Sequence, residues 1–333
     1  MQAAVIDEHG TVEQVKVADV PAPELTPGTV RVELRAAALN HLDLFVVRGI
    51  PGLELPKPHV LGADGAGVVT HVAENVEGVA PGDEVVLDPG LGSPDDEGYA
   101  LLGEMVAGTI AEQIVVPFEN CFPKPKDLSW VEAAAFPLVT LTAWRMLVSK
   151  AKLQAGEWVL IHGIGGGVSL TALQIATHLR AHAVVTSHSE DKRRRAMELG
   201  AARVVDYVNE DVVAAAREAT GGRGVDVVVD NVGEATFADS IRAVRKGGRI
   251  VTCGATTGPK IPVDVRRVFW NQISILGSTM GDRDEFAAML AVVAAGGLQP
   301  VIDEVFPLSE ARAALERLER AEQFGKIVIE IGR

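Results

Sequence analysis

The chain has 333 residues, enough to bury a large core, and this length predicts two domains. Hydrophobic residues make up 47% of it and charged residues 23%, which indicates a soluble globular protein with no membrane partner. The formal net charge of −14 argues against nucleic acid as a partner. Two isolated cysteines, Cys121 and Cys253, and an N-terminus without a signal pattern lead us to expect a cytoplasmic location.

The first 121 residues predict a turn-rich β module, because short apolar runs alternate there with proline and glycine. The expected strands are Ala3–Ile6, Val12–Val17, Val30–Leu34, Val60–Val69 with its continuation Val72–Val76, Glu84–Leu87 and Ala111–Val116. Short strands separated by turn residues are typical of a small barrel. We therefore expect a small β-barrel domain at this end of the chain.

The middle of the chain turns helical from Leu128 and then alternates strands with helices. The expected strands are Trp158–Ile161, Ala183–Ser187, Arg203–Asp206, Val225–Asp230, Arg249–Cys253 and Ile273–Gly277. The expected helices are Trp130–Phe136, Thr140–Ser149, Val168–Leu179, Glu190–Leu199, Asp211–Ala219 and Ala235–Val244. Such alternation predicts an α/β fold, a doubly wound parallel sheet of the Rossmann type.

A glycine-rich turn follows the first strand of this sheet, with Gly163, Gly165, Gly166 and Gly167 standing just before a helix. Glycines allow a tight turn and a close backbone approach, and the exposed N–H groups of a helix start favour an anion. The turn therefore predicts a dinucleotide diphosphate site, although a glycine run alone is also compatible with an ordinary strand-to-helix turn. Ser169 replaces the last glycine of the fingerprint and is small enough for the same packing.

The tail after Gly277 changes pattern again and is expected to complete the β module. Its expected elements are the helix Asp284–Ala295, the strand Val301–Phe306, the helix Ser309–Ala321 capped by Ser309, and the strand Lys326–Ile331. We therefore expect one domain from residues 1–121 with 281–333, and a second domain from residues 122–280.

Several motifs recur in the order seen in a known superfamily. They are AAALNHLD from Ala36, LGADGAGVV from Leu61, PGDEVV from Pro81, LTAW from Leu141, HGIGGGVS from His162, DNVG from Asp230, ILGS from Ile275 and the ending FGKIVIEI. In this order the chain resembles the medium-chain dehydrogenase/reductase superfamily, and within it the zinc-free quinone oxidoreductases and enoyl-type reductases. The resemblance spans the chain and implies a GroES-like, partly open β-barrel domain beside the Rossmann domain.

The resemblance also shows where zinc ligands are missing. Zinc-dependent members of the superfamily carry a cysteine where Asn40 stands and His-Glu where Ala63 and Asp64 stand. Their four-cysteine structural lobe corresponds to Leu91–Gly108, which has no cysteine. We therefore expect no zinc. Asp64 with His41 or His59 remains a chance alternative for a metal.

Asn40 and Asp43 match an Asn-x-x-Asp pattern that the family places at its catalytic cleft. Asn40 would donate to a substrate or cofactor oxygen, and Asp43 would orient a ribose hydroxyl or a water. The alternative is that both residues cap a helix starting near His41. Related quinone reductases carry a tyrosine where Phe45 stands, which leaves the proton donor open, with His41 and Tyr99 as substitutes.

The end of the second Rossmann strand carries no acid, and it reads Ser187-His188 with Lys192 and three arginines behind it. An acid there is the mark of NAD enzymes, so we expect NADPH, with NADH possible as a second cofactor. By resemblance, Ser187, His188, Lys192 and Tyr207 contact the 2′-phosphate; the alternative is that the basic run is a solvated helix face. The resemblance extends the cofactor site to Thr142, Gly163, Gly165, Gly166, Gly167, Val168, Asn231, Val232, Cys253, Gly254, Ala255, Gly277, Ser278 and Lys326.

These features predict an NADPH-dependent reductase of quinones or α,β-unsaturated carbonyls that works without zinc, with its substrate in a cleft between the domains. One alternative is a zinc-independent alcohol dehydrogenase acting as a carbonyl reductase. Another is an NADPH-binding protein with a regulatory or RNA-binding role, which the acidic composition disfavours.

The sixth strand predicts a homodimer. The segment from Gln272 to Gly277 contains no charge and no proline, so an exposed edge of this composition invites pairing with a second copy. The alternative is that the tail helix Asp284–Ala295 covers this edge within one chain.

Overall fold

The computed structural model describes residues 1–332, and the chain forms two compact units, each described here by itself. The first unit contains Met1–Val139 and the chain from Gly281 onward, and the second contains Thr140–Met280. The first boundary therefore lies 18 residues beyond the one expected from the sequence (139 − 121). The reason is a small alanine core, in which Ala133–Ala135 pack with Ala36, Ala38 and Val328 of the β module.

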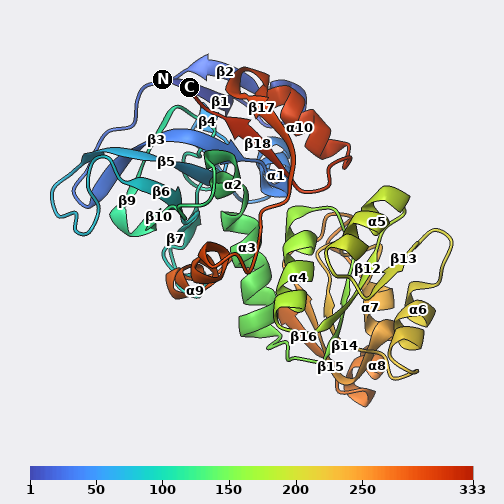
Figure 1. The fold of residues 1–333 in the computed structure, drawn as a ribbon. Helices are drawn as coiled ribbons and strands as arrows, with labels where there is room; N and C mark the ends of the chain where they lie inside the picture. The colour runs from blue at the N-terminus through green and yellow to red at the C-terminus, as the bar shows by residue number, and fades with distance from the viewer. Residues whose placement is uncertain (333) are drawn as a thin grey trace. The chain divides into compact units, whose positions relative to one another are not determined.

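The first unit is organised around β3 (Thr29–Ala38), whose side chains alternate between buried and half-buried until the strand becomes fully buried at its end. It pairs antiparallel with β5 (Asp64–Val72) along most of its length. On its other side, β3 pairs first with β9 (Gln113–Pro117) and then with β18 (Lys326–Glu330). Strand β3 therefore brings strands from the first 121 residues and β18, near the end of the chain, into one sheet (Figure 1).

The large sheet runs in the order β10-β6-β5-β3-β18-β17, with β9 also on β3, and smaller sheets join β2-β1-β4 and β7-β8. The remaining strands are β1 Gln2–Ile6, β2 Lys16–Asp19, β4 His59–Val60, β6 Glu84–Leu87, β7 Gly90–Leu91, β8 Ala100–Leu101, β10 Cys121–Pro123 and β17 Ile302–Pro307. The helices are η1 Val12–Gln14, α1 His41–Arg48, η2 Phe118–Asn120, α2 Trp130–Ala135, α9 Arg283–Ala294, η4 Leu308–Glu310 and α10 Ala311–Glu319, and α3 Pro137–Trp144 spans the boundary.

The second unit is a parallel sheet with helices on its flanks, as predicted (Figure 1). Its strand order is β13-β12-β11-β14-β15-β16, the doubly wound order in which the first strand lies at the centre and the chain reverses direction beside it. The strands are β11 Trp158–Ile161, β12 His182–Thr186, β13 Arg203–Val205, β14 Val225–Val229, β15 Val244–Thr252 and β16 Ser274–Gly277. The helices are η3 Arg145–Lys150, α4 Gly167–His178, α5 Glu190–Glu198, α6 Val212–Ala219, α7 Phe237–Ala243 and α8 Val265–Trp270.

Some predicted elements of the first unit are wrong in detail. Residues 12–14 form a 3₁₀ turn rather than a strand, and the buried side chains Val12 and Val15 are three positions apart. The expected strand from Val60 is interrupted at Gly62, whose φ of +99° suits glycine and breaks the extended backbone. Residues 73–76 do not continue that strand, because Asn75 turns the chain with a φ of +62°.

The predicted cap of the last helix is also wrong. The helix α10 begins at Ala311 after a 3₁₀ turn, its N-cap position is Glu310, and no side chain caps it. Ser309 lies inside that turn instead. Among residues 1–332, no helix combines the length and the hydropathy that crossing a membrane requires.

Candidate functional site

The start of α1 gathers the two predicted catalytic residues into a closed hydrogen-bond arrangement. The Asn40 backbone N–H donates to Asp43 Oδ2 at 2.7 Å, and the Gly62 N–H donates to Asp43 Oδ1 at 3.0 Å. Asp43 is 1% exposed, and burial raises the pKa of its carboxyl to about 6. Both carboxyl oxygens are used by backbone donors, which favours the helix-capping interpretation for Asp43.

Asn40 belongs to a buried cluster with Asp64 and Lys326, named here the Lys326 cluster. The Lys326 ammonium donates to Asn40 Oδ1 at 2.5 Å and to Asp64 Oδ2 at 2.9 Å, and Asn40 Nδ2 donates to the same Asp64 oxygen at 2.9 Å. The second Asp64 oxygen accepts from the Leu138 N–H at 2.7 Å. All three side chains of the cluster are at most 5% exposed. Each charge is therefore compensated within the protein.

This cluster does not fit a zinc ion. By the resemblance, catalytic zinc ligands would stand at Asn40, Ala63 and Asp64, and these residues offer an amide, a methyl group and one carboxylate. The ammonium of Lys326 lies 2.9 Å from that carboxylate and would repel a divalent cation. Among residues 1–332 there is also no group of three or more His, Cys, Asp and Glu side chains arranged to hold a metal.

The other residues considered for catalysis or metal binding lie in separate surroundings. His41 is half-buried at the first position of α1, and burial together with the Lys326 and Arg48 charges lowers its pKa. His59 is buried, and its Nε2 lies 3.1 Å from the Gly103 carbonyl oxygen. Tyr99 lies beside Gly90, at the β7 hairpin. The proposed alternative of Asp64 with His41 or His59 as a metal site thus gains no support from the geometry.

In the second unit, the glycine turn leads from β11 into α4. Gly163 has a φ of +66° and Gly165 a φ of +133°, conformations that favour glycine. Gly166 is the N-cap, and no side chain caps the helix. Ser169, 1% exposed, donates its hydroxyl to the carbonyl oxygens of Gly163 at 3.0 Å and Gly166 at 2.9 Å. The serine therefore stiffens the turn and leaves the first N–H groups of α4 for an anion.

The end of β12 carries hydroxyl and imidazole groups rather than an acid. Thr186 Oγ1 accepts from the Gly163 N–H at 3.0 Å and ties this strand to the glycine turn. Ser187 is 3% exposed, and its Oγ accepts from the Ser189 N–H. The His188 Nδ1 lies 2.6 Å from the Tyr207 hydroxyl, so these two predicted residues are in contact.

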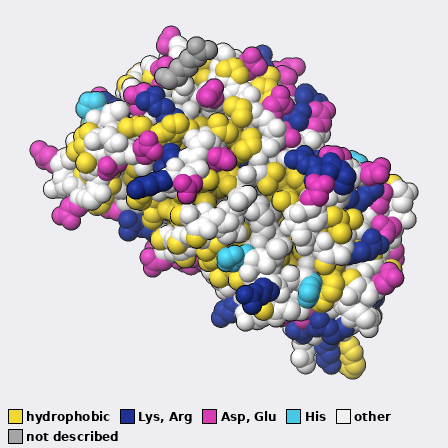
Figure 2. All heavy atoms as spheres, viewed as in Figure 1, with side chains coloured by type: hydrophobic (Ala, Val, Ile, Leu, Met, Phe, Trp, Pro, Cys, Tyr) yellow, Lys and Arg dark blue, Asp and Glu magenta, His cyan; other side chains and the backbone are white. Residues whose placement is uncertain are grey.

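The basic run on α5 does not act as one group. Figure 2 shows Lys and Arg side chains gathered over this helix, with acidic side chains between them. Arg194 pairs with Asp191 and Glu198, whereas Arg193 pairs with Asp206 at 3.1 Å and donates to the Ser187 carbonyl. Arg193 and Arg194 are therefore engaged within the protein.

The remaining predicted cofactor residues of this unit follow strands β14, β15 and β16, and so they lie at the carboxyl edge of the sheet. Val232 lies beside the glycine turn, with Cγ2 3.5 Å from the place a Gly163 Cβ would take. The Ser278 N–H donates to the Thr252 carbonyl, next to Cys253. Residues placed at this edge are Gly163, Gly165, Gly166, Gly167, Val168, Ser187, His188, Asn231, Val232, Cys253, Gly254, Ala255, Gly277 and Ser278. Thr142 lies in α3, where its hydroxyl contacts Met280 Sδ at 3.5 Å.

Two buried polar atoms at this edge have no partner. Asn231 Oδ1 and Ser278 Oγ are both inaccessible to solvent, and no hydrogen bond reaches either atom from the described residues. An unmatched buried acceptor or hydroxyl costs about 1–3 kcal/mol, so such atoms are commonly completed by a ligand. Together with the uncapped α4, they show that the residues present fit a bound dinucleotide.

Sequence reasoning missed a buried network behind the site. Asp230, at the end of β14, is fully buried and accepts from the Ser240 and Thr236 hydroxyls and from the Gly233 N–H. His162 Nε2 lies 3.0 Å from the same Ser240 hydroxyl, and burial lowers the pKa of this histidine. The sequence feature that could have indicated this network is Asp230, a carboxylate that directly follows an apolar strand and precedes Gly233. This network holds the loop that carries Asn231.

Comparison with known proteins identifies two matching families. The family described as "Alcohol dehydrogenase GroES-like domain" matches residues 26–126, and the family described as "Zinc-binding dehydrogenase" matches residues 167–295. The first lies within the first unit and supports its GroES-like character. The second covers most of the Rossmann sheet and extends to Ala295.

Full-length relatives were also found. A zinc-type alcohol dehydrogenase-like protein of Schizosaccharomyces pombe is 34% identical over 99% of this chain and 99% of its own length. A crotonyl-CoA reductase of Streptomyces collinus is 31% identical over 95% of this chain and 81% of its own length. A crystal structure described as an NAD-dependent alcohol dehydrogenase has a TM-score of 0.95 and 46% identity, and the match covers 100% of both chains.

Proposed function

Because this chain belongs to the medium-chain dehydrogenase/reductase superfamily and is an oxidoreductase, we propose that it reduces quinones or α,β-unsaturated carbonyls with NADPH and without zinc. The observation that carries the proposal is the Lys326 cluster. By the resemblance, Asn40 and Asp64 stand where zinc-dependent members carry zinc ligands, and here both side chains are bonded to the buried Lys326 ammonium. In this proposal the reaction therefore stabilises charge without a metal at these positions.

The absence of zinc ligands favours substrates whose developing charge is delocalised. Hydride addition to a simple ketone concentrates charge on one oxygen, where zinc as a Lewis acid contributes several kcal/mol. Addition to an enone or quinone spreads that charge into an enolate or hydroquinone, which hydrogen-bond donors are able to stabilise. The crotonyl-CoA reductase among the relatives acts, by its name, on such a conjugated carbonyl.

The second unit supplies the cofactor site in this proposal. NADPH, when bound, would supply the hydride. The uncapped start of α4 and the glycine turn would hold its diphosphate, and Asn231 and Ser278 would complete their hydrogen bonds on it. Ser187, His188 and Lys192 would receive the 2′-phosphate, because no carboxylate at the end of β12 would repel it.

A zinc-independent alcohol dehydrogenase is the second candidate, and one observation favours it. The solved structure that shares 46% of its residues with this chain is described as an NAD-dependent alcohol dehydrogenase. This candidate differs from the first in both cofactor and substrate class.

The experiment is NADPH and NADH oxidation with a panel of quinones, enones, aldehydes and ketones, before and after chelator treatment. We expect turnover of quinones or enones with NADPH that a chelator leaves unchanged. Turnover confined to aldehydes and ketones would favour the second candidate, and stoichiometric zinc whose removal stops activity would overturn the zinc-free proposal. Tight NADPH binding without turnover would instead indicate a regulatory protein.

We also propose a cytoplasmic homodimer that binds neither nucleic acid nor membrane. Strand β16 forms one end of the sheet order, and Ile275 on it is 42% exposed. A second copy that pairs antiparallel with this strand would satisfy its outer N–H and C=O groups. The free thiols of Cys121 and Cys253 suit a reducing compartment.

A further inference from the structure

The centre of the Rossmann sheet separates two loops that the proposed cofactor site needs together. Strand β11 lies between β12 and β14, and the chain leaves β11 toward β12, so the order of the strands reverses between β11 and β14. In doubly wound sheets, ligands bind at the carboxyl edge where this reversal occurs. The glycine turn lies on one side of this point, and the loop that carries Asn231, whose Oδ1 has no partner, lies on the other.

Three buried side chains connect these two loops, and they are named here the Ser240 network. His162, directly before Gly163, places its Nε2 3.0 Å from the Ser240 hydroxyl, and this hydroxyl donates to Asp230 Oδ2 at 2.6 Å. The other neighbours of the hydroxyl oxygen, the Asp230 carboxylate and the Thr236 carbonyl, only accept hydrogen bonds. The Nε2 atom of His162 therefore carries a hydrogen and donates it to Ser240.

The Asp230 end of the network fixes the second loop. Asp230 Oδ1 accepts from the Val232 N–H at 3.1 Å and from the Gly233 N–H at 3.0 Å, so the backbone is held directly after Asn231. The Val232 side chain reaches back to the glycine turn, with Cγ2 3.5 Å from the place that a Gly163 Cβ would take. The hydrogen bonds and this contact together close a ring that joins the two loops.

The side chains of the Ser240 network act through the backbone rather than by contact with a ligand. Asp230 and Ser240 are 0% exposed and His162 is 2% exposed, and both Asp230 oxygens are used by backbone and hydroxyl donors. Removal of the Ser240 hydroxyl would leave the His162 N–H without its acceptor in the protein interior. A dinucleotide held by both loops would then have to order them on binding, which lowers its affinity.

We propose that His162 and Ser240 are positioning residues for the dinucleotide, and that their hydrogen bond, closed on Asp230, holds the glycine turn and the Asn231 loop together before the cofactor binds. This inference rests on the proposed function, which places a dinucleotide at this edge. NADPH and NADH share the diphosphate and differ only in the 2′-phosphate proposed for the end of β12. The network therefore affects both dinucleotides equally.

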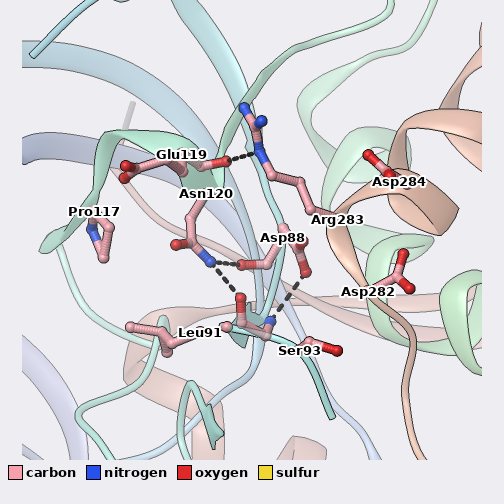
Figure 3. Close-up of a pocket in the computed structure, with 11 residues that line it drawn as sticks. Asp88, Leu91, Ser93, Pro117, Glu119, Asn120, Asp282, Arg283 and Asp284 are labelled. Atoms are coloured by element: carbon pink, nitrogen blue, oxygen red, sulfur yellow. Dashed lines mark hydrogen bonds between the residues drawn. The ribbon is translucent and has the colours of Figure 1, made fainter. Parts of the chain in front are cut away.

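A buried tie in the first unit provides one matched control. Asn120, 6% exposed, donates its Nδ2 to the Asp88 carbonyl at 2.8 Å and to the Gly90 carbonyl at 2.6 Å, and so joins η2 to the turn after β6 (Figure 3). This tie is also buried and also joins two turns, but none of its residues belongs to the proposed cofactor site. Asn120→Ala should therefore lower stability and leave the affinity for both dinucleotides unchanged.

A second control lies in the same unit as the network. Thr220 Oγ1 accepts from the Gly224 N–H at 2.9 Å, directly before β14 and thus at the amino edge of the Rossmann sheet. Thr220→Ala removes a hydroxyl tie of the same kind at the edge opposite the proposed site. It should weaken the second unit without a change in dinucleotide affinity.

The test is fluorescence titration of the full chain with NADPH and, separately, with NADH, alongside urea unfolding of each variant. Ser240→Ala should bind both dinucleotides about tenfold more weakly, whereas the two controls should keep the wild-type affinity. A purely structural role would instead lower stability in all three variants and change affinity in none.

Variants of His162 keep the test decisive if Ser240→Ala fails to fold. His162→Gln retains an N–H donor at about the reach of Nε2 and should bind both dinucleotides within about threefold of the wild-type protein. His162→Leu removes the donor and should lose about as much affinity as Ser240→Ala. The double variant His162→Leu with Ser240→Ala should bind no more weakly than either single variant, because both changes break the same hydrogen bond.

The outcomes separate this inference from the proposed function. Wild-type affinity in both Ser240→Ala and His162→Leu, equal losses in the controls, equal losses in His162→Gln and His162→Leu, or additive losses in the double variant would each overturn the positioning role and leave the proposed function standing. A wild-type protein that binds neither dinucleotide would overturn both.

Discussion

The starts of two helices, α1 in the first unit and α4 in the second, use opposite chemistry. At α1 the carboxylate of Asp43 takes two backbone N–H groups, and the Asn40 side chain is bonded at both ends by the Lys326 cluster. At α4 the N-cap is a glycine, no side chain caps the helix, and the Ser169 hydroxyl turns toward carbonyl oxygens. The protein therefore completes one helix start with its own side chains and leaves the other for a ligand.

The largest expected effect comes from removing the Lys326 charge beside the start of α1. Lys326→Met leaves the buried Asp64 carboxylate without its cation, and we expect a loss of about 3–5 kcal/mol in the free energy of unfolding. Lys16→Met is the matched control, because the Lys16–Asp7 pair lies at the surface and should contribute at most about 1 kcal/mol. Urea unfolding of the wild-type protein and both variants measures these losses in the free energy of unfolding. Equal losses would show that the Lys326 cluster is not held by charge pairing.

The second prediction concerns a side-chain cap added at the start of α4. Gly166 has φ −79° and ψ 160°, and a Cβ there would meet no atom closer than 3.9 Å, so Gly166→Asp fits and would cap α4. Stability should change by less than about 0.5 kcal/mol, whereas NADPH affinity should fall at least about 100-fold through repulsion of the diphosphate. Gly166→Ser caps the helix without charge and should bind NADPH better than the aspartate variant. Fluorescence titration measures both, and undiminished binding by Gly166→Asp would remove the diphosphate from this turn.

A smaller effect is expected at Ser187, where the proposed site would distinguish NADPH from NADH by the 2′-phosphate. Ser187→Asp places at the end of β12 the acid that NAD enzymes carry, so kcat/KM with NADPH should fall about 30-fold while NADH is retained or gains. Ser187→Asn is the neutral control of equal size. Steady-state kinetics with both cofactors provide the measurement. The wild-type protein itself should prefer NADPH, and equal efficiency with NADH would remove the basis of this comparison.

The smallest effect concerns the sheet edges of the two units. Ile275 on β16 and Val305 on β17 are both 42% exposed on strands at the end of their sheet order. Ile275→Lys should weaken the proposed dimer about tenfold or more without loss of NADPH binding, and Val305→Lys should leave it intact. Sedimentation velocity at several concentrations measures both. A wild-type protein that sediments as a monomer at micromolar concentration contradicts the dimer.

Much of the second unit could be predicted because its pattern is local. Valine-rich strands such as Val225–Val229 bury every side chain and follow one another at the spacing of parallel strands. The positions after these strands lie at one edge of the sheet by topology alone. The glycine turn and the missing acid at Ser187 were readable for the same reason. The hydroxyl bonds of Ser169 were not, because a serine at a helix start is compatible with several partners.

The first unit was less predictable because its decisive contacts are not local. The Lys326 ammonium meets Asn40 across 286 positions of sequence, and Asp64 meets Leu138 across 74. Residue types alone left Asn40 and Asp43 equally suited to capping and to a catalytic cleft. Only the assembled sheet, in which β18 lies antiparallel beside β3, brings Lys326 at the start of β18 to the end of β3, next to Asn40.

The sequence by itself determined the Rossmann sheet and the glycine turn, since these depend on periodicity and on side-chain types, and the resemblance indicated which residues stand where zinc ligands are expected. The tertiary structure decided what took the place of those ligands. A buried carboxylate needs a compensating charge, and the chain provides it from Lys326, far away in sequence, where no local pattern records the pairing.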